Sequence, residues 1–117
     1  MSPDQIAAAN ADLRSKSPLE IVRWAIAQAP GRAIVSTNFR PYEAVVLHLA
    51  TQVQPDIPVL WVDHGYNRPA TYKHAEQLRA QLKLNLKPFL PKMTPAHRDA
   101  IFGEIPTTED EAGLKKF

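Results

Sequence analysis

Two short apolar runs, each followed by a polar turn and a helix-like segment, constrain the fold of this chain more than any other feature. They cover residues 33–36 and 59–62. The second is a continuous apolar run of the kind found in strands covered on both faces. Strands that alternate with helices pair in parallel through right-handed crossovers. The sequence therefore predicts an α/β fold with a parallel sheet and helices on both faces.

Local start and stop signals predict the other elements. Ser17, Pro18 and Glu20 form a typical helix start, because serine caps the helix, proline fits its first position, and a carboxylate completes a capping box. In the same way Thr94 and Pro95 begin a helix that Gly103 ends. The remaining expected elements are helices over residues 4–13, 41–53, 70–82 and 107–117, and a third strand over 84–90.

The length of 117 residues predicts one domain over residues 1–117. We expect a helical segment over 1–31, a β-α-β-α-β core over 32–90, and a helical segment over 91–117 that is incomplete. The predicted fold is then a three-layer α/β arrangement whose parallel sheet is truncated to about three strands.

Composition excludes several classes of function. A net charge of +2 is too small to indicate binding to nucleic acid or to a membrane surface. The chain has neither an apolar run of bilayer length nor a signal peptide, so a cytoplasmic location is expected. It has no cysteine, which excludes disulfides, iron–sulfur clusters and thiolate nucleophiles within these residues. Its four histidines lack metal-ligand spacing, so neither a metal site nor a cofactor is expected.

The first polar turn is a candidate anion site. It lies between the strand at 33–36 and a helix that begins at Pro41, so free backbone N–H groups gather at a helix N-terminus. The hydroxyls of Ser36 and Thr37 and the guanidinium of Arg40 add further donors for a phosphate or sulfate. The alternative is a capped strand-to-helix turn with Arg40 in solvent.

The second turn, at residues 63–65, follows the strand at 59–62. Asp63 would bind a ribose or a base, and Gly65 would let the chain turn tightly. His64 also lies at the strand end. The alternative is an aspartate-capped loop, which is common. Since ligands bind beyond the carboxyl ends of parallel strands, the two turns together indicate a nucleotide site.

These two turns, taken in order, resemble one known family. Residues 36–39 (STNF) and 43–49 (EAVVLHL) are similar to the phosphate-binding loop and helix of the phosphoadenosine-phosphosulfate (PAPS) reductases. Residues 55–59 (PDIPV), the D-x-G-Y at 63–66, the P-x-T-Y at 69–72 and the LKLNLK at 82–87 resemble that family's second nucleotide-binding segment, next helix and third strand. The likeness covers residues 32 to 87, and more loosely extends to 103.

The resemblance implies an adenine nucleotide alpha hydrolase-like fold. It also implies that PAPS or adenosine phosphosulfate (APS) is reduced to sulfite, with electrons from thioredoxin or glutaredoxin, during sulfate assimilation. By that likeness Ser36, Thr37, Asn38 and Phe39 surround the phosphosulfate, while Asp63 and Gly65 lie near the adenosine. The chain departs from the family where Arg40 replaces a usual glycine and His64 a usual threonine.

The missing thiol leaves three functions open. The resemblance implies a cysteine nucleophile in a C-terminal tail, and a chain without cysteine cannot supply it, so no catalytic residue is expected here. The chain is then the substrate-binding part of a reductase, a non-catalytic adenine-nucleotide-binding module, or a relative of the ATP pyrophosphatases, whose Ser-Gly-Gly signature it lacks. A three-stranded sheet would also leave 33–36 as an exposed edge, which predicts self-association, aggregation or reliance on a missing C-terminal half.

Overall fold

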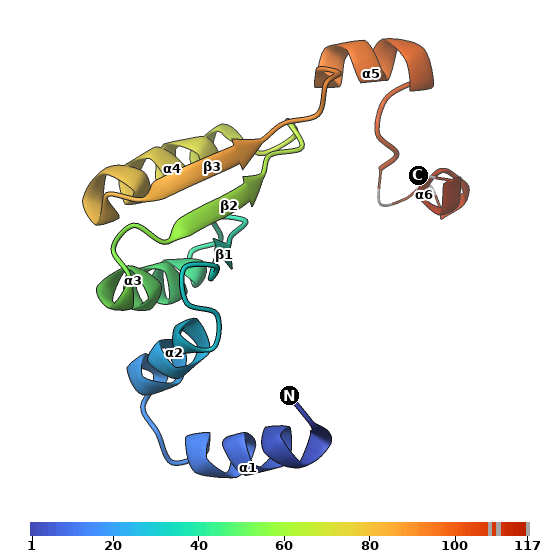
Figure 1. The fold of residues 1–117 in the computed structure, drawn as a ribbon. Helices are drawn as coiled ribbons and strands as arrows, with labels where there is room; N and C mark the ends of the chain where they lie inside the picture. The colour runs from blue at the N-terminus through green and yellow to red at the C-terminus, as the bar shows by residue number, and fades with distance from the viewer. Residues whose placement is uncertain (108, 110, 117) are drawn as a thin grey trace.

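A computed structural model describes residues 1–107, 109 and 111–116 of the chain (Figure 1). The elements follow in the order α1 (Pro3–Leu13), α2 (Pro18–Ala27), β1 (Val35–Ser36), α3 (Glu43–Val53), β2 (Pro58–Val62), α4 (Pro69–Leu82), β3 (Asn85–Phe89), α5 (Pro95–Phe102) and α6 (Glu111–Lys116). Residues 108, 110 and 117 of the helix expected at the C-terminal end lie outside the described part.

The three strands form one parallel sheet in the order β1-β2-β3, which confirms the predicted α/β class. Val35 pairs with Val59 in β2, and β2 pairs along its whole length with β3. Strand β1 is shorter than expected, although the N–H of Thr37 still donates to the carbonyl of Leu60 at 3.0 Å. Among the described strands β1 has β2 as its only neighbour, so it is an edge of this sheet.

Short polar side chains fix the starts of three helices. Ser17 accepts a hydrogen bond from the N–H of Glu20, and Thr94 caps α5 in the same way. The reciprocal capping box occurs in α1, where Ser2 and Gln5 bond each other's backbone N–H groups. Helix α3 differs from expectation, because it begins at Glu43 and not at residue 41.

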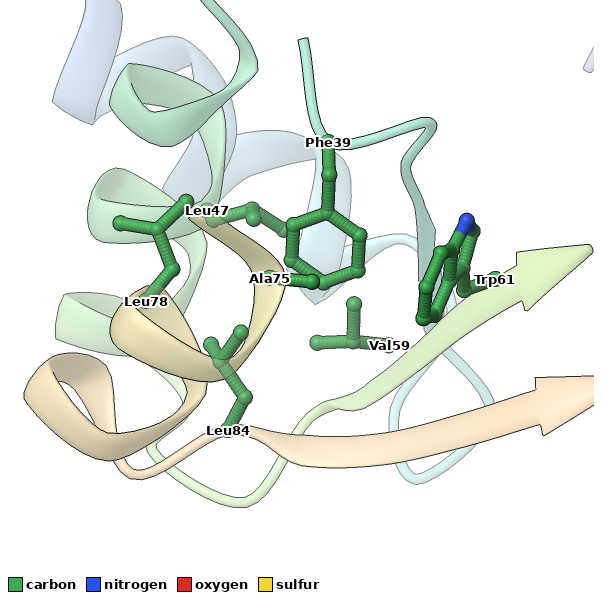
Figure 2. Packing of buried hydrophobic residues seen from close by; sticks show 7 residues of the cluster. All are labelled: Phe39, Leu47, Val59, Trp61, Ala75, Leu78 and Leu84. Atoms are coloured by element: carbon green, nitrogen blue, oxygen red, sulfur yellow. The ribbon is translucent and has the colours of Figure 1, made fainter. Parts of the chain in front are cut away.

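The core lies on the face of the sheet that carries Val59 and Trp61. Helices α3 and α4 cover this face, and the loop between β1 and α3 adds an aromatic side chain to it. On the other face Leu60 is half-buried, and Val62 is 67% exposed. Figure 2 shows the central cluster, formed by Phe39, Leu47, Val59, Trp61, Ala75, Leu78 and Leu84.

The outer helices extend away from the sheet. Helix α2 packs on α3, while α1 lies beyond α2, and α5 and α6 lie past the end of β3 (Figure 1). The Cα radius of gyration is therefore 18.6 Å, against about 13 Å for a compact domain of 100 residues. Within residues 1–107, 109 and 111–116, every helix is too short or too polar to cross a lipid bilayer.

Candidate functional site

The two turns predicted from the sequence meet at one end of the sheet. They follow β1 and β2 at the carboxyl ends of these neighbouring parallel strands, which is where α/β sheets bind ligands. A cavity of about 460 Å³ lies between them, and it is lined by Asn38, Phe39, Arg40, Pro41, Trp61, Val62, His64, Asn67 and Thr71. This volume lies within the usual range for small-molecule sites.

The first loop is wrapped around a carboxylate of its own chain. Oxygen Oε2 of Glu43 accepts hydrogen bonds from the N–H of Arg40 at 2.7 Å and the N–H of Asn38 at 3.1 Å. The hydroxyl of Thr37, a residue only 5% exposed, donates to the same oxygen at 3.4 Å. The Thr37 hydroxyl and two of the backbone N–H groups predicted to bind an external anion are thus engaged by Glu43. Residues 41 and 42 form a turn in which Tyr42 already has α-helical backbone angles, and the regular helix α3 begins at the next residue, Glu43.

Phe39 contributes its side chain to the core. Its ring is 2% exposed and meets Trp61 edge to face, with centroids 4.9 Å apart and planes at 83°. Its backbone φ of 55° lies in the left-handed region, and its N–H donates to the Thr37 hydroxyl oxygen at 2.9 Å. The same residue therefore anchors the loop and forms one wall of the cavity.

Arg40 and Ser36 occupy different positions around the loop. The Arg40 side chain is exposed and belongs to the cavity wall, where it is the charged residue of the lining. Within the described part of the chain its guanidinium makes neither a hydrogen bond nor an ion pair. Ser36 and Thr37 do not line this cavity. They line a second one of about 320 Å³, together with Asn38, Glu43, Leu60 and Val62.

Asp63 holds the second turn together. It is 6% exposed, and its Oδ1 accepts hydrogen bonds from the Gly65 N–H at 2.9 Å, from Asn67 Nδ2 at 3.1 Å and from the Tyr72 hydroxyl at 2.8 Å. These are the contacts of an aspartate that caps a strand-to-helix loop. They draw Asn67 toward the turn, and Asn67 also lines the 460 Å³ cavity.

His64 and Gly65 complete the turn in different ways. The exposed His64 ring lines the cavity, and its Nδ1 accepts the N–H of Tyr66 at 3.0 Å. Gly65 has a φ of 86° and lies against Pro95, whose Cγ would be 2.6 Å from an added Cβ. Tyr66 bonds the same region, since its hydroxyl donates to Asp99 Oδ1 at 2.8 Å. The start of α5 is thus packed on this turn.

Two tyrosines near the turn hold their protons more tightly than usual. Burial raises the pKa of Tyr72, and its hydrogen bond to Asp63 and the charge of that carboxylate raise it further. Burial likewise raises the pKa of Tyr66, with the bond to Asp99 as the next cause. Both hydroxyls therefore act as donors at neutral pH.

The structure adds residues that the sequence reasoning did not select. Asn67 and Thr71 line the cavity, and Glu43 fills the loop. Only Glu43 had a readable signal, since an acidic residue three positions after Arg40 has the spacing at which a capping carboxylate reaches back to backbone N–H groups. In the ranges that the structure describes, no group of three His, Asp or Glu side chains is placed to hold a metal ion.

Comparison with known proteins agrees with this architecture. Residues 32–111 match the model of the phosphoadenosine phosphosulfate reductase domain family. The chain is 40% identical over 108 residues to the phosphoadenosine 5′-phosphosulfate reductase of Synechococcus sp., covering 92% of this chain and 47% of that protein. It is also 40% identical to the enzyme of the same name from Serratia proteamaculans, covering 96% and 46% of the two chains.

A solved structure shares the fold. The phosphate complex of phosphoadenylyl-sulfate (PAPS) reductase from Candida auris superposes with a TM-score of 0.80 at 21% identity, over 96% of this chain and 55% of that one. The chain spans about half the length of the curated relatives it matches. The family match and the sequence identity lead to one conclusion: this chain belongs to the phosphoadenosine phosphosulfate reductase family.

Proposed function

We propose that this chain forms the substrate-binding part of a PAPS reductase of sulfate assimilation and binds an adenine sulfonucleotide, PAPS or APS, between its two turns. The observation that carries the proposal is the 460 Å³ cavity at the carboxyl ends of β1 and β2, in a member of this family. Arg40 is the charged residue of its lining, so the cavity favours an anionic ligand.

The exposed polar groups of the cavity have distinct capacities. The Arg40 guanidinium offers a fork of N–H donors that matches a phosphate or sulfate group. Because Nδ1 of His64 accepts a hydrogen bond, the neutral ring carries its proton on Nε2 and presents a second donor. Asn67 and Thr71 also line the cavity, and their amide and hydroxyl groups suit the polar groups of a nucleoside.

The proposed chemistry needs a thiol that these residues lack. In the reaction a cysteine thiolate attacks the sulfur, the bond from sulfur to the nucleotide phosphate oxygen breaks, and the nucleotide leaves. Two electrons from thioredoxin or glutaredoxin, which the cytoplasm keeps reduced, then release sulfite. Since the chain has no cysteine, it binds substrate while a thiolate from elsewhere attacks.

Titration calorimetry with PAPS, APS and ATP tests the proposal. Arg40→Ala is expected to weaken PAPS binding by about 1.5–3 kcal/mol, or roughly 10- to 150-fold, through loss of a charge-assisted contact. Arg14→Ala removes the same charge from an exposed position at the end of α1 and serves as the matched control. An unchanged affinity in Arg40→Ala would exclude that contact, and the absence of heat with all three nucleotides would refute the proposal.

A non-catalytic nucleotide-binding module is the second candidate, and the absence of cysteine favours it. The coding sequence after Phe117 separates the two. A basic segment followed by a cysteine-bearing tail would identify a reductase, whereas a stop codon would identify the module.

The exposed apolar surface supports a further polypeptide partner. Ile34 beside the edge strand β1 is 56% exposed, and Val45 and Val46 on α3 are 62% and 49% exposed. An open strand edge with apolar neighbours favours pairing with another chain. We therefore expect self-association of the isolated chain, and size-exclusion chromatography with light scattering would refute it by showing a monomer at all concentrations.

A further inference from the structure

The loop that precedes α3 holds an anion already, and that anion is part of the protein. Glu43 Oε2 accepts the N–H of Arg40 at 2.7 Å and the N–H of Asn38 at 3.1 Å, and the Thr37 hydroxyl lies 3.4 Å away. Three donors converge on one carboxylate oxygen at the N-terminus of an 11-residue helix. Helix N-termini favour negative charge, so the carboxylate is well placed there.

We infer that Glu43 is an internal competitor of the anionic group of the ligand and sets the affinity of the site. This inference rests on the proposed function. The N–H groups of Asn38 and Arg40 each bond the carboxylate, so they cannot also bond a phosphate or sulfate in the same position. A bound anion would also lie close to a like charge. The Glu43 side chain must therefore leave before the ligand engages these donors.

A cavity beside the loop leaves space for the Glu43 carboxylate to rotate away from the loop donors. Glu43 is half-buried and lines the 320 Å³ cavity beside the loop, on the side of Ser36 and Leu60. The larger cavity lies against Arg40 and His64 and does not include Glu43 in its wall. Asn38 lines both cavities, so the loop that Glu43 bonds separates one cavity from the other. A rotation of one side chain thus exchanges the internal anion for an external one.

The competition between Glu43 and the ligand predicts how much the PAPS affinity changes when Glu43 is replaced. If the loop donors are free in only a fraction of molecules, the apparent affinity falls by that fraction. A carboxylate that leaves them free about a tenth of the time weakens binding about tenfold. Removing it by Glu43→Ala should therefore tighten PAPS binding by about tenfold. Glu43→Gln should tighten it by a smaller factor, because the neutral amide oxygen accepts the same bonds more weakly.

A purely structural role of Glu43 predicts different PAPS affinities for the two variants. If Glu43 only supports the loop, Glu43→Gln keeps an acceptor and leaves PAPS affinity unchanged, while Glu43→Ala loosens the loop and weakens binding. The experiment is calorimetric titration of PAPS into wild type and both variants, with thermal unfolding to confirm that each is folded. Glu20→Gln, an equal change of charge at an exposed position on α2, controls for a general attraction of anions.

Each outcome has one meaning. The inference is supported if both Glu43 variants bind PAPS more tightly than the wild type and Glu20→Gln does not. It is also supported if the Glu43 variants bind PAPS while the wild type and Glu20→Gln show no binding. Binding by the wild type with equal or weaker binding by the Glu43 variants overturns the inference and leaves the proposed function intact. No binding by any of these proteins overturns the proposed function, and this inference falls with it.

Discussion

Replacing Asp63 tests how the second turn is built, because one oxygen of this side chain accepts three hydrogen bonds. The donors are the Gly65 N–H at 2.9 Å, Asn67 Nδ2 at 3.1 Å and the Tyr72 hydroxyl at 2.8 Å, around a residue only 6% exposed. Hydrogen bonds to a charged group contribute about 1.5–3 kcal/mol each, and part of this returns when water reaches the freed donors. We expect Asp63→Ala to lower the free energy of unfolding by about 3–5 kcal/mol.

Urea unfolding followed by tryptophan fluorescence measures this loss, and Trp61 lies 5.8 Å from Tyr72 between ring centroids. Asp63→Asn keeps an acceptor oxygen but removes the charge, so it should lower the free energy of unfolding by about 1–2 kcal/mol. Asp12→Ala, at an exposed position on α1, should change stability by less than about 0.5 kcal/mol. A loss below about 1 kcal/mol in Asp63→Ala would refute the view that this carboxylate organises the turn.

Two further predictions concern the same turn. Gly65→Ala should lower the free energy of unfolding by about 2–4 kcal/mol, because of its positive φ and of contact between the new Cβ and the Pro95 ring. Gly31 also has a positive φ, of 71°, but nothing lies within 4 Å of an added Cβ, so Gly31→Ala should lower it by only about 1–2 kcal/mol. Equal losses of unfolding free energy in the two urea titrations would exclude the proline contact. The pKa of Tyr72 is raised in the folded state above the ordinary tyrosine value of 10.0, so its contribution to stability is complete below pH 10 and is lost as the pH rises through the folded-state value. Between pH 9 and 12 the wild type should therefore lose more stability than Tyr72→Phe, and parallel pH profiles would contradict this.

The sequence predicted the order of the elements well, because strong local signals mark them. Ser2, Ser17 and Thr94 each bond the N–H three residues on, as the serine–proline and threonine–proline starts indicate. The continuous apolar run at 59–62 became the central strand, which is covered on one side by helices and bordered by a strand on each edge. These features depend on residues that are close together in the chain.

The candidate site was harder to predict, because its geometry depends on contacts between separate segments. The spacing of residues 36–40 indicates a loop rich in donors, but nothing in it shows that Phe39 turns into the core and leaves Arg40 exposed. The spacing of Glu43 from Arg40 indicates that the carboxylate reaches back to the loop, but it does not show that the same oxygen also accepts from Asn38 and Thr37. Whether the predicted residues bind a nucleotide stays a prediction for the titrations described above.

The packing of Pro95 and Asp99 against the second turn has a consequence for the order of events during synthesis. The bond between the Tyr66 hydroxyl and Asp99 joins residues 33 positions apart, and the intervening chain contains all of α4 and β3. Chains emerge from the ribosome N-terminal end first. The wall around Tyr66 therefore cannot take its final form until α5 has left the exit tunnel, which is later than the point at which the first loop and its partner strand β2 have emerged.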